Sequence, residues 1–351
     1  MKIYINCRFL TQRITGVQRF AYEIIKALDL LLTGSSVQVI GLLPNLQINS
    51  QYDLSEFKNI QFEKCGRLYG HLWEQIELPF YSKGSYLLSL CNTSPIFKLK
   101  QYATLHDVIF LTDLDSQKLW FKLWYRLIAF ASKFTAKKIF TVSEFSKAEI
   151  IRLLGISGDK LVVLGNAPSL EKQIADFSII DKLSLQSNEY FFMLGSNSKR
   201  KNTNLVARVF ANNPQLNESK LVICGGEFSN LGASEKIISS NILYTGYVSD
   251  AQLVALYMNT KAFIFPSIYE GFGIPVIEAM SLGVPVLCSD IPVMREVCGS
   301  IASYFDPYCE SSLVSILLNQ TNSQIDHANL IQQSEKYQWL DFATKLLDNI
   351  N

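Results

Sequence analysis

The chain has 351 residues, about twice the length of a typical domain, so we expect two domains of similar size. Hydrophobic residues make up 48% of the chain and charged residues 18%, a composition that excludes a disordered protein. The 32 Lys and Arg residues balance 31 Asp and Glu residues. A net charge of +1 excludes a global attraction to nucleic acid or to an anionic membrane.

Cationic side chains interrupt every apolar stretch before the roughly 18 residues that a membrane-spanning helix needs. The N-terminal sequence MKIYINCRFL indicates a first strand and not a signal peptide, so we expect a cytoplasmic protein. The seven cysteines are dispersed and include no C-x-x-C pair. This spacing predicts reduced, buried thiols and no zinc site.

In chain order, short apolar runs alternate with segments of helical period, which is typical of βα units and parallel sheets. In the first half, the apolar runs predict strands at residues 1–6, 37–43, 86–90, 102–107 and 137–143. The helical period predicts helices at 16–32, 116–136 and 146–154. This half ends near residues 161–168.

The second half repeats the pattern, with strands expected at 190–196, 220–226, 241–248, 261–267 and 284–290. Helices are expected after Asn202, at Ser249 and at Pro275. The sequence therefore predicts an α/β protein of two Rossmann-like domains with an interdomain cleft. Its expected parts are an N-terminal domain at 1–168, a polar linker at 169–189, a C-terminal domain at 190–335 and a closing helix at 336–351 that crosses back to the first domain.

The densest chemistry lies in SIYEGFGIPVIEAMSLGVPV (267–286), which reads as strand, loop, helix and strand. Gly271 and Gly273 allow backbone amides to approach a ligand closely, and a proline suits the first helical turn. The amides and the positive dipole end of such a helix suit a diphosphate. Glu278, about one turn into the helix, can present a carboxylate to vicinal hydroxyls such as those of a ribose.

The pattern E-G-F-G-x-P-x-x-E-A-M-x-x-G-x-P-V, which begins at Glu270, resembles the retaining glycosyltransferases of family GT4, which have the GT-B fold. The resemblance implies that Glu270 binds hydroxyls of the donor sugar and that Glu278 binds the ribose. It also implies that the amides of Gly271, Phe272 and Gly273 hold sugar and phosphate. No divalent metal and no other cofactor is implied.

A D-x-D sequence of the kind that presents a divalent cation occurs at Asp113-Leu114-Asp115. Its place at an expected helix start favours a capping role. Capping needs no cation, so this sequence does not change the expectation of a metal-independent site.

The loop SNSKRKN (196–202) follows an expected strand and supplies Arg200 and Lys201. Fixed cations stabilise the charge that a departing nucleoside diphosphate accumulates, and they can replace a metal ion there. The loop resembles the family pattern G-x-x-x-P-R-K-N, with Gly195 at its start. Lys199 stands where the family has proline.

Two further segments resemble parts of the family that surround the donor. In TGYVSD (245–250), the backbone at Tyr247 and Val248 would contact the base, although both could equally be core residues. Gly16, between the first strand and the first helix, would lie near the donor phosphates.

On the first domain, the expected strand 102–107 ends in His106 and Asp107, which resembles the family's H-D at the sugar-binding edge. A histidine at a strand end in a cleft wall can bind a hexose hydroxyl, so we count His106 with the catalytic residues. Asp107 either contacts substrate or caps a turn. Trp73 in GHLWEQIELP and Asn92 in CNTSP also resemble the family and suggest a wall for the acceptor.

The segment 118–138 predicts a basic and aromatic helix. At roughly 100° per residue its cations fall within an arc of about 100°; they are Lys118, Lys122, Arg126, Lys133 and Lys137. Such a stripe beside large aromatic residues can contact anionic lipid, where a polyprenyl-linked acceptor would lie. The alternative is an amphipathic helix with a solvated cationic face.

Taken together, the resemblance implies a retaining, metal-independent hexosyltransferase, with mannose from GDP-mannose as the expected donor. The expected acceptor is a glycan or a polyprenyl-linked glycan in the synthesis of O-antigen or capsule, at the inner face of the cytoplasmic membrane. No nucleic acid partner is expected. Whether the reaction proceeds by front-face attack, which we favour, or through a covalent intermediate stays open.

The alternatives are a nucleotide-sugar epimerase of the same fold and a nucleotide-sugar-binding protein without turnover. An NAD-dependent enzyme is disfavoured because no G-x-G-x-x-G follows the first strand.

Overall fold

The computed structural model describes residues 2–112, 114, 118–196, 198–225, 236–319 and 326–350. The chain forms two compact units. Unit 1 contains the described residues of 1–113, 117–166 and 338–351, and unit 2 contains those of 114–116 and 167–337. Residues 169–189 are part of unit 2 and do not form a separate linker: their helix α6 (Ser178–Lys182) packs against α8 (Asp250–Asn259).

Unit 1 is built on a sheet of seven parallel strands in the order β3-β2-β1-β4-β5-β6-β7. The strands are β1 (Lys2–Asn6), β2 (Gln38–Pro44), β3 (Gln61–Cys65), β4 (Tyr86–Leu88), β5 (Gln101–Thr104), β6 (Ala136–Thr141) and β7 (Leu161–Val163). Because β4 lies on the other side of β1 from β2, the strand order reverses direction between β1 and β4.

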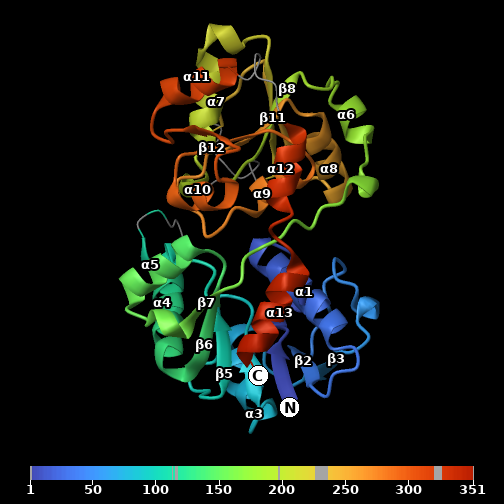
Figure 1. The fold of residues 1–351 in the computed structure, drawn as a ribbon, viewed down its shortest axis with the longest axis vertical. Coiled ribbons are helices and arrows are strands. Elements are labelled where there is room, and N and C mark those ends of the chain that lie inside the picture. The colour runs from blue at the N-terminus through green and yellow to red at the C-terminus, as the bar shows by residue number, and fades with distance from the viewer. Residues whose placement is uncertain are drawn as a thin grey trace. The chain divides into compact units, whose positions relative to one another are not determined.

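The helices of unit 1 include one from the far end of the chain. They are α1 (Gly16–Leu31), α2 (Gly70–Leu72), α3 (Leu78–Tyr81), α4 (Leu119–Thr135), α5 (Glu144–Leu154) and α13 (Trp339–Ile350). A π-helical turn, η3 (Trp73–Glu77), joins α2 to α3. Helix α13, red in Figure 1, lies alongside α1, blue, and the Tyr102 hydroxyl of β5 donates to the carbonyl of Ile350 at 3.1 Å.

Alternation along the strands of unit 1 directs side chains to two faces. On one face, Ala103 and Ile139 pack against Ala129 of α4 and Ile150 of α5. Tyr102 and Phe140 alternate with them and lie on the other face of the sheet. Both faces are therefore apolar, as expected for a parallel sheet that is covered on both sides.

Unit 2 is built on six parallel strands in the order β10-β9-β8-β11-β12-β13. They are β8 (Tyr190–Leu194), β9 (Lys220–Cys224), β10 (Ile242–Gly246), β11 (Ala262–Phe265), β12 (Val286–Ser289) and β13 (Ser303–Phe305). Its longer helices are α7 (Thr203–Asn212), α8, α9 (Ile274–Ser281), α10 (Pro292–Cys298), α11 (Glu310–Asn319) and α12 (His327–Ser334). Here the strand order reverses between β8 and β11.

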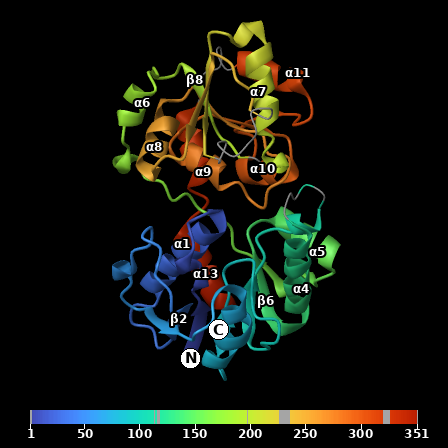
Figure 2. The ribbon, with the colours of Figure 1, turned by 180° about the vertical axis from the view of Figure 1, so that it is seen from behind.

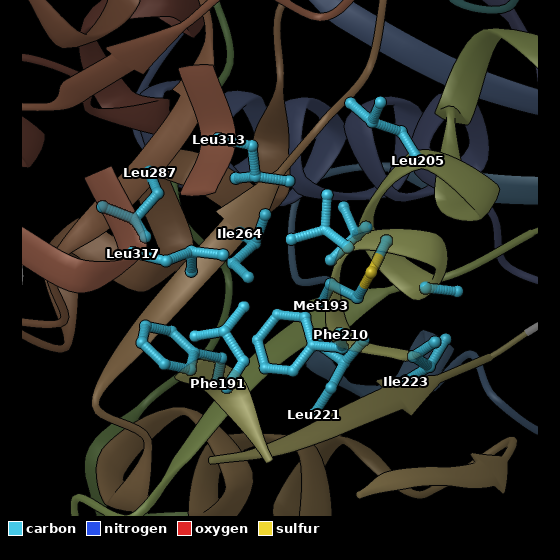
Figure 3. Close-up of a cluster of buried hydrophobic side chains, with 14 of the residues drawn as sticks. Phe191, Met193, Leu205, Phe210, Leu221, Ile223, Ile264, Leu287, Leu313 and Leu317 are labelled. Carbon is cyan, nitrogen blue, oxygen red and sulfur yellow. The ribbon is translucent and has the colours of Figure 1, made fainter. Parts of the chain in front are cut away.

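The core of unit 2 packs two helices against one face of its sheet. Phe191, Met193 and Ile264 from the strands meet Phe210 of α7 and Leu313 of α11, and all are buried (Figure 3). Helices α7 and α11 also lie side by side in Figure 2.

The opposite face of this sheet carries Phe192, whose ring meets Tyr257 of α8 edge-on with centroids 5.0 Å apart. Tyr190 of the same strand donates its hydroxyl to the carbonyl of Leu256 at 2.7 Å. These contacts pack α8 against this face of the sheet.

The observed elements confirm the predicted α/β class with two Rossmann-like parallel sheets. Most predicted strands and helices occur within a few residues of their expected bounds, but β3 and β13 have no counterpart among the predicted strands. β3 is an edge strand with no fully buried residue, so it lacks an apolar run. All seven cysteines are free thiols, and four of them are buried: Cys7, Cys224, Cys288 and Cys298.

Short 3-10 turns follow several strands and position side chains at the sheet edges. They are η1 (Arg8–Thr11), η2 (Leu54–Glu56), η4 (Ile109–Leu111), η5 (Gly158–Lys160), η6 (Lys172–Ile174), η7 (Lys199–Lys201) and η8 (Pro214–Leu216). In the part of the chain that the structure describes, no helix combines the length and the apolar character needed to span a bilayer.

Candidate active site

The reversal of strand order in unit 2 brings two loops together. Arg200 and Lys201 lie in η7, which follows β8, and Glu270 follows β11. These strands are neighbours in the sheet. In open α/β sheets a ligand binds beyond the carboxyl ends of the two strands at such a reversal.

Three charged side chains meet there. Oε1 of Glu270 lies 2.7 Å from the Nη1 atom of Arg200 and 2.7 Å from the Nζ atom of Lys201. The Glu270 side chain is 12% exposed, and those of Arg200 and Lys201 are 27% and 22% exposed. Two cations therefore share one carboxylate, and the cluster keeps a net positive charge.

The electrostatics of the cluster favour an ionised carboxylate. Burial acts to raise the pKa of Glu270, but the adjacent charges of Lys201 and Arg200 outweigh it, and the pKa is lowered below its ordinary value. The three groups are therefore charged at neutral pH. A second anion entering the cluster would meet cations that are already held in place.

Backbone contacts fix the loop that carries the cations. The amide of Ile268 donates to the carbonyl of Arg200 at 2.8 Å, and Nη1 of Arg200 lies 3.4 Å from the Tyr269 carbonyl. Asn202 has a φ of 52°, and its side-chain amide donates to the carbonyl of Pro307 at 2.8 Å. Lys199, where the family has proline, is the exposed first residue of η7.

Helix α9 starts beside Glu270 in the sequence. Gly273 has a φ of 105°, and a Cβ atom at this position would lie 2.6 Å from Cε of Met294, so the helix start requires glycine. Gly271, Phe272 and Gly273 are buried, and the Phe272 ring meets Tyr337 edge-on at 5.3 Å. Ile274 and Pro275 are half-buried and form the accessible part of the helix start.

Glu278 lies on the second turn of α9 and is 5% exposed. The neighbouring Tyr257 donates its hydroxyl to the Pro275 carbonyl at 3.2 Å. Burial, with the Glu278 charge nearby, raises the pKa of Tyr257 well above its ordinary range. The carboxylate of Glu278 thus lies within the same unit as the cations, behind the first turn of the helix.

The other predicted donor residues of unit 2 lie at strand ends. Gly195 directly follows β8, and its amide donates to the carbonyl of Cys224 at 2.8 Å. Tyr247 and Val248 follow β10; Tyr247 is 59% exposed and Val248 is half-buried. Tyr247 is therefore a surface residue, and the alternative that it belongs to the core is wrong.

In unit 1, His106 is buried by protein contacts. Its Nε2 atom lies 3.0 Å from the carbonyl of Leu90, and the Phe20 ring meets it edge-on at 4.6 Å. Burial lowers the pKa of His106 to about 4, so the ring is neutral at pH 7 and Nε2 donates to the carbonyl. Nδ1 is then the nitrogen with a lone pair.

The remaining predicted residues of unit 1 have mostly structural contacts. Asn92 accepts from the amide of His106 at 2.7 Å, and Asp107 accepts from the amide of Ile109, the first residue of η4, at 3.1 Å. Trp73 is fully buried, and its Nε1 atom donates to the Cys65 carbonyl at 2.8 Å, so its indole forms no exposed wall. Gly16 is exposed at the start of α1.

Sequence reasoning missed a buried polar cluster at the strand reversal of unit 1. It surrounds Glu74 of η3 and includes Asn6, Arg8, His71 and Thr93. Glu74 lies next to Trp73 in the W-E-Q segment, which resembles the family, but no pattern in the sequence indicates its partners. They come from three separate segments of the chain: residues 6–8, His71 and Thr93.

Among the described residues, no group of three or more His, Cys, Asp or Glu side chains is placed to hold a metal ion. Asp113 and Asp115 of the D-x-D sequence lie outside the described residues. Independence from metal remains a prediction.

Comparison with known proteins gives the family. Residues 176–336 match the model of the family "Glycosyl transferases group 1". The chain is 29% identical over 229 residues to the O-antigen chain mannosyltransferase B of Escherichia coli, which covers 61% of this chain and 60% of the relative. It is 30% identical over 237 residues to the O-antigen chain mannosyltransferase RfbU of Salmonella typhimurium, with 65% and 62% covered.

The chain thus spans about 60% of the length of these curated relatives. A solved structure of HepE from Anabaena, in complex with UDP and glucose, matches with a TM-score of 0.73 at 13% identity, covering 99% of this chain and 98% of that one. The likeness extends over both units and shows the GT-B fold. Residues 176–336 thus match the group 1 glycosyltransferases, the family to which the GT4 resemblance of the sequence points, and the whole chain has the GT-B fold.

Proposed function

We propose that this protein transfers a hexose from a nucleotide sugar to a glycan acceptor with retention of configuration and without a metal ion. One observation carries the proposal: Arg200 and Lys201 hold Glu270 at 2.7 Å at the strand reversal of unit 2. This cluster combines cations for a diphosphate with a carboxylate for sugar hydroxyls.

The residues of unit 2 have separate tasks in this proposal. Arg200 and Lys201 bind the diphosphate and stabilise the charge that grows on it as the glycosidic bond breaks. Glu270 accepts hydrogen bonds from hydroxyls of the donor sugar, and Glu278 accepts from the ribose. The amides of the segment 271–273 hold sugar and phosphate, Gly195 allows close approach to the phosphates, and the backbone at Tyr247 and Val248 contacts the base.

The reaction proceeds by front-face attack. The oxygen of an acceptor hydroxyl forms a bond to the anomeric carbon on the face from which the nucleoside diphosphate departs. The hydroxyl proton moves to the departing phosphate oxygen, which keeps the electron pair of the broken bond. The cations lower the barrier because they bind the departing diphosphate more strongly than the intact donor.

In unit 1, Gly16 at the exposed start of α1 approaches the donor phosphates. The lone pair on Nδ1 of His106 accepts a hydrogen bond from a hexose hydroxyl, since Nε2 already donates to Leu90. Asp107 and Asn92 hold the His106 segment and so line the acceptor side.

The donor is GDP-mannose, and the product is part of an O-antigen or capsule chain. This step rests on two relatives that are named O-antigen chain mannosyltransferases.

The acceptor reaches the protein at the inner face of the cytoplasmic membrane, through α4. Exposed apolar side chains of α4 share an arc of about 100° at roughly 100° per residue; they are Leu119, Trp120, Leu123, Leu127, Phe130 and Phe134. The predicted stripe is shorter than expected, because Lys137 lies in β6 and not in the helix. Lys122, Arg126 and Lys133 border the apolar arc, and the two lysines also donate to the carbonyls of Thr112 and Leu154. An apolar face with a cationic border favours lipid over a solvated cationic face.

Sedimentation with vesicles tests this contact. Wild type should bind vesicles of phosphatidylglycerol and phosphatidylcholine, whereas Trp120→Glu/Phe134→Glu should stay in solution. A matched control, Tyr308→Glu, changes an exposed aromatic residue of unit 2. Equal binding by wild type and the α4 variant would contradict the contact.

A thermal-shift screen tests the function. Wild type is heated with GDP, UDP, dTDP or ADP and with their sugars in EDTA, because a ligand that binds the native state raises the unfolding temperature. We expect GDP and GDP-mannose to give the largest shifts. Donor consumption that requires no acceptor and yields an isomeric sugar would indicate an epimerase, and saturable binding without any turnover would indicate a binding protein.

A further inference from the structure

A carboxylate with no solvent exposure lies at the strand reversal of unit 1. The Oε1 atom of Glu74 accepts from Nδ2 of Asn6 at 2.7 Å and from Oγ1 of Thr93 at 2.8 Å. Arg8 Nε lies 3.5 Å from the same oxygen. Asn6 ends β1 and Thr93 follows β4, so the cluster occupies the edge where α/β sheets bind ligands.

The other oxygen of Glu74 holds a histidine. His71 Nδ1 lies 3.0 Å from Oε2, and the two residues are three positions apart. Burial acts to raise the pKa of Glu74, but the hydrogen bond from His71, the Arg8 charge and the other donors outweigh it and lower the pKa. The carboxylate is therefore ionised, and Nδ1 of His71 donates to it.

This contact fixes which nitrogen of His71 faces a ligand. Because Nδ1 is held against the carboxylate, Nε2 is the ring nitrogen that can face a ligand. The side chain is 38% exposed, and Nε2 forms no hydrogen bond with any residue that the structure describes. His71 thus presents an oriented ring nitrogen to the solvent.

A matching donor lies beside it. Trp124 of α4 meets the His71 ring edge-on with centroids 5.6 Å apart, and its buried Nε1 atom has no hydrogen-bond partner among the described residues. Buried donors without a partner are costly, so they often mark the place of a missing ligand. A hydroxyl group both donates and accepts, and it would satisfy both side chains.

The backbone turn that carries Glu74 also carries a second glutamate, Glu77, whose contacts differ. The turn η3 is π-helical, a form found frequently at functional sites. On the same turn, the carboxylate of Glu77 accepts from the amides of Arg67 and Leu68 at 2.9 Å and serves the backbone alone. Glu74 instead accepts from the side chains of Asn6, Thr93 and His71.

We propose that His71 and Trp124 bind a hydroxyl of the acceptor glycan, with Glu74 as a positioning residue that holds the His71 ring. Nε2 of His71 accepts from the hydroxyl, and Nε1 of Trp124 donates to its oxygen. This assignment rests on the proposed transfer reaction. The sequence predicted an acceptor contact at Trp73, which is buried. The proposal assigns this contact to His71 and Trp124 instead.

Two assays on the full chain test the assignment separately from the function. The first measures mannose transfer from GDP-mannose to octyl α-D-mannopyranoside, and the second measures hydrolysis of GDP-mannose without acceptor. We expect His71→Ala to lower kcat/KM for the acceptor by about 10- to 100-fold and to leave hydrolysis unchanged. Trp124→Phe should act in the same direction, and the control Glu77→Gln should retain transfer.

A double variant tests the positioning role. If Glu74 acts through His71, Glu74→Gln lowers transfer in wild type but adds nothing in the His71→Ala background. Should Glu74→Gln not fold, the two His71 assays still decide the assignment.

Wild-type transfer by His71→Ala, or failure of wild type to use the mannoside while it hydrolyses the donor, would overturn the acceptor assignment alone. Absence of both donor binding and hydrolysis in wild type would instead overturn the proposed function.

Discussion

The two units share one sheet order but prepare their strand reversals differently. In unit 2, two partly exposed cations at the sheet edge contact one carboxylate, and the cluster keeps a net positive charge that can bind an anion. In unit 1, one buried carboxylate is surrounded by neutral donors, Arg8 and His71. The difference teaches that the same topology can present charge to a diphosphate at one edge and oriented hydrogen bonds to hydroxyls at the other.

The largest expected effect tests the charge at the unit 2 edge. Lys201→Ala should lower kcat for hexose transfer by about 10²- to 10³-fold, because it removes a fixed charge that acts mostly in the transition state. Lys199→Ala is the matched control, since it removes an exposed lysine from the same turn. Steady-state kinetics of both variants decide the matter, and equal rates would show that charge in this loop is not used.

The second prediction tests whether the neutral His106 of unit 1 contributes to stability. Its pKa in the folded protein is about 4 against an ordinary 6.5, so its contribution is fully present above pH 6.5 and is lost as the pH falls toward 4. Between pH 7 and pH 4 the loss is about 3 kcal/mol.

Urea unfolding of wild type and His106→Asn at both pH values measures this loss. The variant should show a pH dependence that is weaker by that amount. The lowered pKa values of Glu74 and Glu270 give both proteins a shared loss at acid pH, which the comparison removes. The same pH dependence in both proteins would mean that His106 is not buried as a neutral ring.

The third prediction concerns the ribose contact. Glu278→Ala should raise the Kd for GDP by about 10- to 100-fold, since a carboxylate that accepts hydrogen bonds from hydroxyls is lost. Calorimetric titration measures the affinity. Glu296→Ala, at an exposed carboxylate of α10, should bind GDP as wild type does. Unchanged affinity in Glu278→Ala would place the ribose elsewhere.

The smallest effect sharpens the comparison with the family pattern. Lys199→Pro restores the family's proline at the first residue of η7, after Ser198 in an extended conformation. The substitution should raise the free energy of unfolding by about 0.4–1 kcal/mol, because proline lowers the conformational entropy of the unfolded chain. The kcat should stay within about twofold of wild type. A drop in stability would show that the turn differs from the family's.

Much of the unit 2 site could be predicted from sequence because its residues are local. The segment 267–286 contains strand, loop and helix in one run, and the loop 196–202 follows the neighbouring strand. The general rule that ligands lie at strand ends then predicts that the two loops meet. Their contact at 2.7 Å depends on side-chain geometry, which no pattern in the sequence reports.

The unit 1 site could not be predicted in the same way. Asn6, Thr93 and Trp124 come from three segments, and His71 and Glu74 come from a fourth. Each alone looks like an ordinary polar or aromatic residue. The conspicuous Trp73 is instead fully buried, with its indole nitrogen bonded to the Cys65 carbonyl. Its large size was a poor guide, because packing supplied another reason for it.

The most direct measurement of the central claim is a titration of GDP in EDTA. It compares wild type with Arg200→Ala/Lys201→Ala/Glu270→Gln, in which the last change prevents repulsion by an unpaired carboxylate. We expect wild type to bind GDP without a divalent ion and the triple variant to lose at least about 10²-fold in affinity. Binding that requires Mg²⁺, or equal affinity in both proteins, would contradict the account.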